Sequence, residues 1–289
     1  MMVKTTLKPL LINTRGGKTM ERYDKKVALN YENPVVPTGY KHILGEWNTG
    51  FVIQRENDGS LLTWVPVGCL KANGTLDGVS FTEKFGRRKF LPDVFSEYSY
   101  HESMIPELTS QVESIKKYEG FYISSCNISK NKITGKPQSV KGELPWTNIN
   151  FSDAKLIASE FEMNDGITSH LTFGAEYDSL LEWIIQSGVK PRDEIVKDST
   201  KWGNYWNSNH SSRQLVTTGS QASWEINNVC DLAGNVDEWT QEEYGEEWHA
   251  IRGGSFSSTG NNGSAAHRFC YTDQYNYICT GYRIVLTIR

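Results

Sequence analysis

Three short glycine-containing segments in the last third of this 289-residue chain constrain its fold most. They are residues 231–240 (DLAGNVDEWT), residues 252–256 (RGGSF) and residues 281–283 (GYR). Glycine has no Cβ, so the glycines of the first two segments mark points where the backbone turns sharply or packs closely. Trp239 is expected in the core beside these turns. We therefore expect ordered loops around a small core in this part of the chain.

Regular structure is predicted mostly outside these segments. A typical hairpin turn, NDGS, separates two strand-like runs, and two later stretches carry apolar residues at helical spacing. Ser152 and Asp153 are predicted to cap the first helix, and Gly188 to end the second. Few helices, short strands and long loops indicate the α+β class. The predicted strands are residues 50–54, 61–67, 120–124 and 282–288, and the helices are residues 152–161 and 174–187.

Composition and charge exclude several classes of protein. The net charge is −4 and the chain has no concentrated basic face, which nucleic-acid binding needs. No apolar run approaches the length of a membrane span, and the N-terminus does not resemble a signal peptide. The five cysteines are scattered without a CxxC pair, so neither a zinc cage nor a disulfide framework is expected. We therefore expect cytosolic synthesis, no membrane insertion and no nucleic-acid partner.

The three glycine-containing segments resemble, in order, the DLxGNVWEWT, RGGSW/F and GFR motifs of the formylglycine-generating-enzyme family, also called the sulfatase-modifying-factor family. The resemblance extends from about residue 50 to the C-terminus. It implies a C-type-lectin-like fold, with small sheets, two main helices and long ordered loops. Weaker matches lie upstream at residues 120–123, 145–146, 153–154, 171–177 and 202–204.

The first 45 residues differ in texture from the rest of the chain. They are lysine-rich and then turn-rich, ending near the sequence NPVVPTG. We interpret residues 1–45 as an N-terminal arm or attachment segment and residues 46–289 as the family domain. The alternative is that residues 1–45 supply the first pair of strands of that domain.

The enzymes of this family use two cysteines shortly after the GGS motif to bind copper, and soft thiolates suit copper(I). The matching positions here are Ser258 and Gly263, or Gly260 if the loop is shorter, and none is cysteine. A related branch holds iron with three histidines, but no histidine pair here has the HxxxH spacing. We therefore predict a non-catalytic protein. The alternative, a metal-dependent oxidase or sulfur-transfer enzyme, requires Cys270, Cys279 or His267 to converge on a metal.

The segment between the last two motifs, residues 256–281, has the composition of a binding surface. Serine, asparagine, glycine and tyrosine dominate it, as they do in antibody combining sites, where tyrosine gives rigid contact area. The segment also resembles the variable region of retroelement-diversified proteins, which use the same scaffold and the same flanking motifs. The alternative is a polar loop without a ligand.

The residues predicted to contact a ligand lie mostly in this segment, with additions from neighbouring loops. Trp206 is the addition of first choice, and Asn207 and Tyr244 are others. His267 is also the histidine to watch for a metal. The contact residues within the segment are Ser257, Ser258, Asn261, Asn262, His267, Tyr271, Asp273, Tyr275, Asn276 and Tyr277.

The first motif also raises the question of a structural calcium ion; no other cofactor is expected. The resemblance implies that carboxylates and backbone carbonyls of Asp231, Gly234, Val236 and Glu238 can hold calcium, a hard cation that prefers oxygen ligands. The alternative is that both carboxylates cap the loop through hydrogen bonds. Asp237 stands where the family usually has tryptophan, and it adds an acid beside this loop.

The resemblance to diversified variable proteins also implies partners and a location. We expect a protein or glycan receptor on a cell surface, and display on a phage tail or another extracellular surface. Contacts with other virion or tail proteins and a homo-oligomer, for example a trimer, would let weak contacts add by avidity. A purely structural virion protein is a further alternative.

Overall fold

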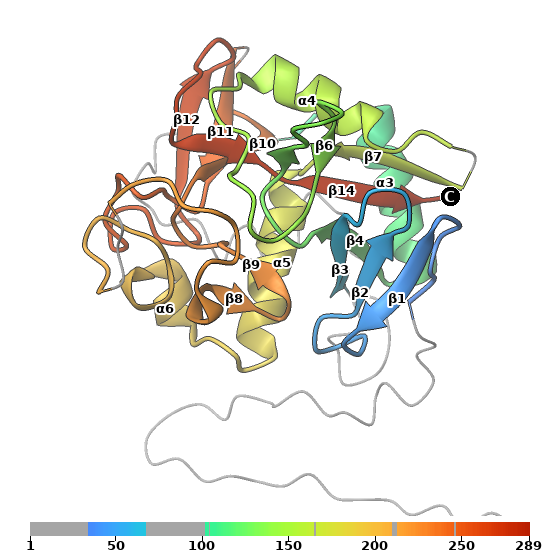
Figure 1. The fold of residues 1–289 in the computed structure, drawn as a ribbon, viewed down its shortest axis with the longest axis horizontal. Coiled ribbons are helices and arrows are strands. Elements are labelled where there is room, and N and C mark those ends of the chain that lie inside the picture. The colour runs from blue at the N-terminus through green and yellow to red at the C-terminus, as the bar shows by residue number, and fades with distance from the viewer. Residues whose placement is uncertain (1–33, 68–101, 104, 165, 210–212, 246) are drawn as a thin grey trace, which may run out of the picture.

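The computed structural model describes residues 34–67, 102–103, 105–164, 166–209, 213–245 and 247–289 (Figure 1). Most of the predicted N-terminal arm, residues 1–33, lies outside this range, so its role stays a prediction. Residues 40–44 form a strand that pairs with the next one, and Tyr40 is buried. The central sheet therefore begins before residue 45.

The largest sheet has six strands and runs through the middle of the molecule (Figure 1). Its order is β1 (Tyr40–Leu44), β2 (Val52–Arg55), β3 (Leu61–Pro66), β4 (Gly120–Ser124), β14 (Ile284–Ile288) and β7 (Ile167–Leu171). All neighbouring strands are antiparallel. The last strand of the chain therefore lies between β4 and β7, and it anchors the C-terminus in the core.

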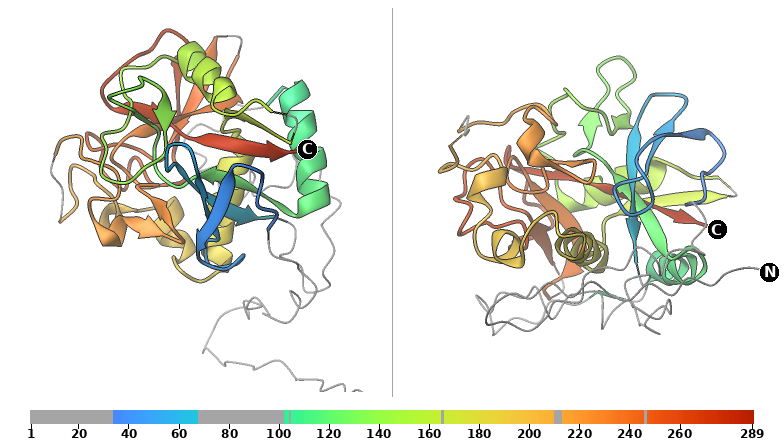
Figure 2. Two further views of the ribbon diagram at one scale, coloured as in Figure 1. Left: turned by 45° about the vertical axis from the view of Figure 1, so that its right-hand side comes forward. Right: turned by 90° about the horizontal axis from the view of Figure 1, so that it is seen from below.

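Helices cover both faces of this sheet. Helices α3 (Pro106–Tyr118) and α5 (Gly174–Gln186) pack on one face, and α4 (Phe151–Glu160) packs on the other (Figure 2). Side chains alternate between the two faces along each strand, so Val65 and Phe121 enter one core cluster whereas Trp64 and Tyr122 enter the other. A short helix, α6 (Arg192–Val196), follows α5. None of the helices described is long and apolar enough to cross a membrane.

A second sheet carries the C-terminal motifs. Its order is β12 (Arg268–Thr272), β11 (Trp248–Arg252), β10 (Asp237–Glu243) and β13 (Thr280–Tyr282). Strands β10 and β13 are parallel, and the chain passes from β13 directly into β14 of the first sheet. Two two-stranded sheets complete the fold: β5 (Ser129–Lys130) with β6 (Pro137–Gln138), and β8 (Glu225–Ile226) with β9 (Val229–Cys230).

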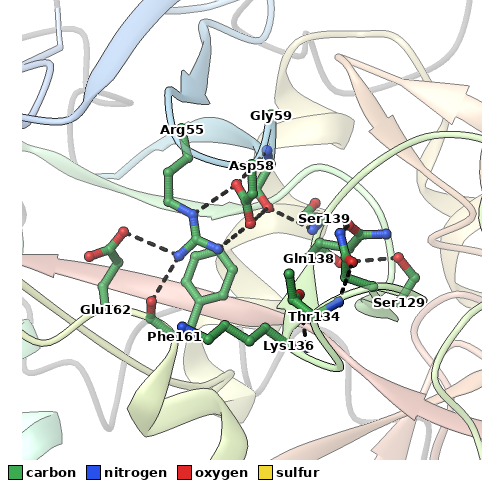
Figure 3. Close-up of polar contacts among 12 residues, drawn as sticks. Arg55, Asp58, Gly59, Ser129, Thr134, Lys136, Gln138, Ser139, Phe161 and Glu162 are labelled. Atoms are coloured by element: carbon green, nitrogen blue, oxygen red, sulfur yellow. Dashed lines mark hydrogen bonds and ion pairs between the residues drawn. The ribbon is translucent and has the colours of Figure 1, made fainter.

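A buried arginine joins the β2–β3 hairpin to the end of α4 (Figure 3). Arg55 forms an ion pair with Asp58, and its Nη1 donates to the carbonyl of Phe161 at 2.8 Å and to Glu162 at 3.2 Å. The guanidinium also lies 3.6 Å from the centre of the Phe161 ring. Tyr40 of β1 donates to Glu162 at 2.8 Å, so the same group of contacts also fixes β1.

The predicted α+β class and most predicted elements agree with this structure. The predicted N-cap of α4, at Ser152 and Asp153, was wrong. The N-cap is Asn150, whose side chain accepts a hydrogen bond from the amide of Asp153 at 2.8 Å. Two main helices were expected, but α3 is a third. Its inward face includes the polar Gln111, which donates to Glu176 at 2.7 Å, so its apolar periodicity is weak.

Candidate ligand-binding surface

Four buried charged side chains fix the C-terminal segment to the rest of the fold. We call Asp178, Glu242, Arg252 and Arg268 the ion-pair frame. Arg252 donates to Asp178 at 2.6 Å and to Glu242 at 3.2 Å. Arg268, its cross-strand partner, donates to Glu242 at 2.7 Å and also pairs with Asp178. All four side chains are at most 2% exposed, so each charge depends on the others for compensation.

The arginine of the last motif has a similar structural role. Arg283 donates through Nε to both oxygens of Glu238, at 2.8 and 3.0 Å, and through Nη1 to the carbonyl of Ser124 at 3.0 Å. It also donates to the carbonyl of Cys230. Asn127 donates to Glu238 at 2.7 Å. Arg283 therefore holds the point where the chain changes sheets, and its charge is fully compensated inside the protein.

Two glycines of the motifs are required by close packing. Gly234 has φ +72°, and a Cβ there would lie 2.6 Å from the carbonyl oxygen of Asn204. Gly254 has φ +71°, and a Cβ there would lie 2.1 Å from the carbonyl oxygen of Gly263. The sequence-based expectation of tight turns is therefore met at both motifs, and the loop of residues 255–263 folds back on Gly254.

Above this frame, five rings form a continuous row that we call the aromatic ladder: His267, Phe269, Tyr271, Tyr275 and Tyr277. Phe269 and Tyr271 are alternate residues of β12 and share a face of the sheet. The His267 ring stacks beside Phe269, 6.4 Å away by ring centres. The rings of Tyr271 and Tyr275 are stacked, 3.7 Å apart at their centres. Phe269 lies 5.1 Å from Tyr271, and Tyr277 lies 6.2 Å from Tyr275. Tyr277, at one end of the ladder, is 53% exposed, and Phe269, within it, is 39% exposed, so the ladder presents open apolar surface.

The loop of residues 255–263 borders the segment that carries Trp206. The amide of Trp206 donates to the carbonyl of Ser258 at 2.9 Å, and Asn207 accepts the amide of Gly260 at 3.0 Å. Trp206 is 49% exposed. Asn261 and Asn262 are exposed on the same loop. The structure therefore brings Trp206 next to the predicted contact loop, although they are about 50 residues apart in sequence.

A chain of polar contacts links this loop to the other end of the segment. The hydroxyls of Ser255 and Ser257 are 3.1 Å apart, and the Ser257 hydroxyl is 3.2 Å from the Cys279 thiol. Cys279 follows the exposed residues Asn276, Tyr277 and Ile278. The loop and the C-terminal end of the ladder therefore belong to one surface with Ser257 between them.

Two predicted contact residues, Asp273 and Ser258, form hydrogen bonds within the protein, and a third, His267, is half-buried. Asp273 accepts from His249 at 2.6 Å, and the His249 ring stacks on Phe151 at 3.4 Å. The Ser258 hydroxyl bonds the backbone of Ser255 in both directions, at 2.9 Å each. His267 is a neutral base, because burial and the adjacent Arg252 and Arg268 lower its pKa to about 4. Their contact roles stay predictions, and Tyr244 lies in the β10–β11 turn.

Sequence reasoning missed two members of this surface. Phe269 alternates with His267 and Tyr271, a period-two signal that could have identified it. Asp237 was noted only as a departure from the family pattern. It is half-buried, its carboxylate accepts hydrogen bonds from Ser255 and the Gly254 amide, and burial is the main cause that raises its pKa to about 7.

The residues at the family's copper positions do not fit copper. Ser258 offers a hydroxyl that is already bonded to Ser255, and at Gly263 a Cβ would lie 2.7 Å from the Ser258 oxygen. The alternative thiols do not converge either. Cys270 is on β12 and Cys279 adjoins β13, the two outer strands of the four-stranded sheet, about 14 Å apart across three strand spacings.

The predicted calcium ligands likewise do not form a free oxygen cluster. Glu238 is occupied by Arg283 and Asn127. Asp231 accepts the Gly219 amide at 2.7 Å through one oxygen, and its other oxygen is buried without a hydrogen-bond partner. Burial raises the pKa of Asp231 to about 6. Within the described ranges no group of three or more acidic, histidine or cysteine side chains is arranged to hold a metal.

The chain matches one protein family and is similar to several solved structures. A family model described as the sulfatase-modifying factor enzyme 1-like domain matches residues 30–288. No curated protein matches the chain. Similar solved structures include Treponema denticola variable protein 1, at 13% identity and TM-score 0.42, covering 58% of this chain and 85% of that one. PvdO from Pseudomonas aeruginosa has 15% identity and TM-score 0.44, with coverage of 59% and 82%. The P3c variant of the Major Tropism Determinant has 13% identity and TM-score 0.38, with coverage of 58% and 51%.

Proposed function

This chain belongs to the family of sulfatase-modifying factor enzyme 1-like domains, and from that premise we propose that it is a non-catalytic binding protein whose residues 256–281 display a receptor-binding surface. The family and the C-type-lectin-like fold were predicted correctly from the motifs, and the α+β class from the expected helices, strands and loops. The observation that carries the proposal is the aromatic ladder, which ends in exposed rings above a fully buried ion-pair frame.

Exposed, ordered aromatic rings favour binding for a physical reason. A tyrosine contributes a large amphipathic contact area and loses little conformational entropy, because it has few rotatable bonds. Stacking on Tyr271 holds Tyr275 in place before any ligand arrives, which lowers the entropy cost of association. Tyr277 and Ile278 extend this surface into solvent. Aromatic residues placed in this way are the usual source of strong contacts in interfaces.

The residues at the family's catalytic positions support a non-catalytic role. Ser258 and Gly263 offer no thiolate for copper, and Cys270 and Cys279 lie at opposite edges of the four-stranded sheet. The ladder instead occupies the neighbouring surface with residues suited to contact. A binding role therefore accounts for more of the segment than an oxidase or sulfur-transfer role does.

We propose a protein or glycan receptor on a cell surface as the partner, with the chain carried on a phage tail or another extracellular particle. Several copies in a homo-oligomer would increase the total affinity through multivalency. Contacts with other tail proteins belong to the same proposal. We also propose that residues 256–281 are diversified by a retroelement. Sequencing the encoding locus from many clones tests this part of the proposal directly. Substitutions confined to those codons, with a reverse-transcriptase gene nearby, are expected; a fixed segment without such a gene would contradict diversification.

Binding itself is tested with fluorescently labelled protein and a panel of intact bacterial strains. Tyr277→Ala removes an exposed ring, and Ile133→Ala is the control because Ile133 is 96% exposed in the β5–β6 hairpin, outside residues 256–281. We expect at least one strain to bind the wild type, about tenfold weaker binding by Tyr277→Ala, and unchanged binding by Ile133→Ala. Binding that is insensitive to Tyr277, or no binding to any strain, would count against the proposal.

A further inference from the structure

One carboxylate at the centre of the binding surface differs from the buried acids around it. Asp237 begins β10 and pairs in register with Thr280 of β13. Side chains at paired positions lie on one face, and alternate residues share it, so Trp239 lies on that face too. Tyr275 packs 6.3 Å from Trp239 by ring centres. Asp237 therefore lies between the aromatic ladder and the loop of residues 255–263.

The charge of Asp237 is not matched inside the protein. Asp178, Glu242 and Glu238 each form ion pairs with an arginine. Asp237 has only two neutral donors, the hydroxyl of Ser255 and the amide of Gly254, and no ion pair in the described part of the chain includes it. A carboxylate held partly out of water without a cation is costly, unless something outside the chain supplies the positive charge.

A hydroxyl on the same face has no hydrogen-bond partner among the described residues. This hydroxyl belongs to Thr280 and is buried, with the residue 1% exposed. Buried hydroxyls are nearly always bonded to protein, water or ligand. Thr280 pairs in register with Asp237, so its hydroxyl, which can accept a hydrogen bond, lies next to a carboxylate that has no ion pair.

We propose that Asp237 and Thr280, beside the ring of Tyr275, form a subsite that binds an ammonium group of the ligand. This inference rests on the proposed function, because it names the chemistry that the binding surface recognises at its centre. The ligand is therefore a receptor that presents a protonated primary amine, such as a lysine side chain or an amino sugar.

The composition of the subsite favours an ammonium over other ligands. An ammonium has three donors in a compact head, which matches a carboxylate and a hydroxyl acceptor. An aromatic ring beside the carboxylate adds a cation–π attraction. A divalent metal would need more oxygen ligands than one carboxylate and one hydroxyl supply. An anionic ligand group would be repelled by Asp237.

The test uses two small probes and amide NMR spectra of the full chain. Nα-acetyl-lysine methylamide carries the ammonium, and Nα-acetyl-norleucine methylamide is its neutral analogue. We expect the lysine probe to shift the amide signals of Gly254 and Tyr275. The dissociation constant from these shifts should be at least about tenfold lower for the lysine probe than for the norleucine probe. Asp237→Asn should abolish this preference, and Thr280→Val should weaken it by a smaller factor. The control Glu160→Gln, an exposed acid at the end of α4, should leave it unchanged.

The outcomes separate this inference from the proposed function. Equal shifts with both probes would overturn the ammonium subsite and leave the aromatic binding surface standing. A lysine preference that survives in a folded Asp237→Asn protein would overturn the assignment to Asp237. No shift at these amides with either probe would overturn the subsite as well, whereas the receptor-binding proposal is judged by the Tyr277→Ala cell-binding experiment.

Discussion

Arg268 and Tyr277 lie only nine positions apart in the sequence, but they belong to two regions with opposite requirements. In the ion-pair frame every charge is buried and has a partner within the protein. In the aromatic ladder the rings rise from partly buried stacking at Tyr271 to open exposure at Tyr277. The difference shows that the buried ion pairs of Arg268 can fix a short segment to the core while the side chain of Tyr277 in the same segment stays exposed.

The strongest test of this comparison removes a charge from the frame. Arg252→Met leaves Asp178 and Glu242 buried with less compensation, so the free energy of unfolding should fall by about 3–5 kcal/mol. Urea denaturation measures it. The control Lys136→Met changes an exposed side chain and should stay within about 0.5 kcal/mol of the wild type. A loss below about 1 kcal/mol at Arg252 would mean that the frame does not hold the segment.

A smaller effect is expected where the segment folds back on its motif. Gly254→Ala meets the carbonyl of Gly263 at 2.1 Å, whereas Gly135→Ala has the same φ of +71° and its nearest atom 3.9 Å away. The control should lose about 1 kcal/mol from the left-handed backbone alone, and Gly254→Ala about 1–3 kcal/mol more. Thermal unfolding compares them. Equal losses would show that the close approach at Gly254 is not a constraint.

Some of the features that carry this account could be predicted from the sequence, and others could not. The glycine turns, the flanking motifs and the contact composition of residues 256–281 could be read directly, because turn glycines and tyrosine-rich loops have local signatures. The proximity of Trp206 to Ser258 could not, because it depends on how two distant loops pack. Helix α3 was missed because polar Gln111 and Ser114 occupy its buried face. The lack of an ion pair at Asp237 could not be predicted either, because it depends on Arg252 and Arg283 pairing with other acids in the folded protein.

The titration of Asp237 sharpens the contrast between matched and unmatched acids. Burial and the charge of Glu238 raise the pKa of Asp237 to about 7 in the folded protein, from 3.8. The folded state therefore holds more protons than the unfolded state from about pH 4 to about pH 7, so stability falls as pH rises through that window. Asp237→Asn should gain about 1–2 kcal/mol over the wild type between about pH 5 and about pH 8.

Urea denaturation at several pH values measures that gain. The raised pKa of Asp231 acts in the same direction, but both proteins retain it, so the difference isolates Asp237. Glu160→Gln, which removes an exposed carboxylate at the end of α4, serves as the control. A constant difference between Asp237→Asn and the wild type across pH would contradict the assignment of an unmatched carboxylate.

The smallest expected effect concerns metal. Because Arg283 and Asn127 already occupy Glu238, calcium addition or removal with a chelator should leave the melting temperature unchanged. A rise in melting temperature on adding calcium to chelated protein would restore the calcium site at Asp231 and Glu238.

The most direct measurement of the central claim is a saturation scan of residues 252–283 in displayed protein, read for both protease resistance and binding to a receptor-bearing strain. Substitutions at Arg252 and Arg268, the two frame residues within this range, and at Arg283 should lose both properties. Substitutions at Asn276, Tyr277 and Ile278 should keep protease resistance and lose binding. Binding that depends on the frame but not on these exposed positions would contradict a displayed receptor-binding surface.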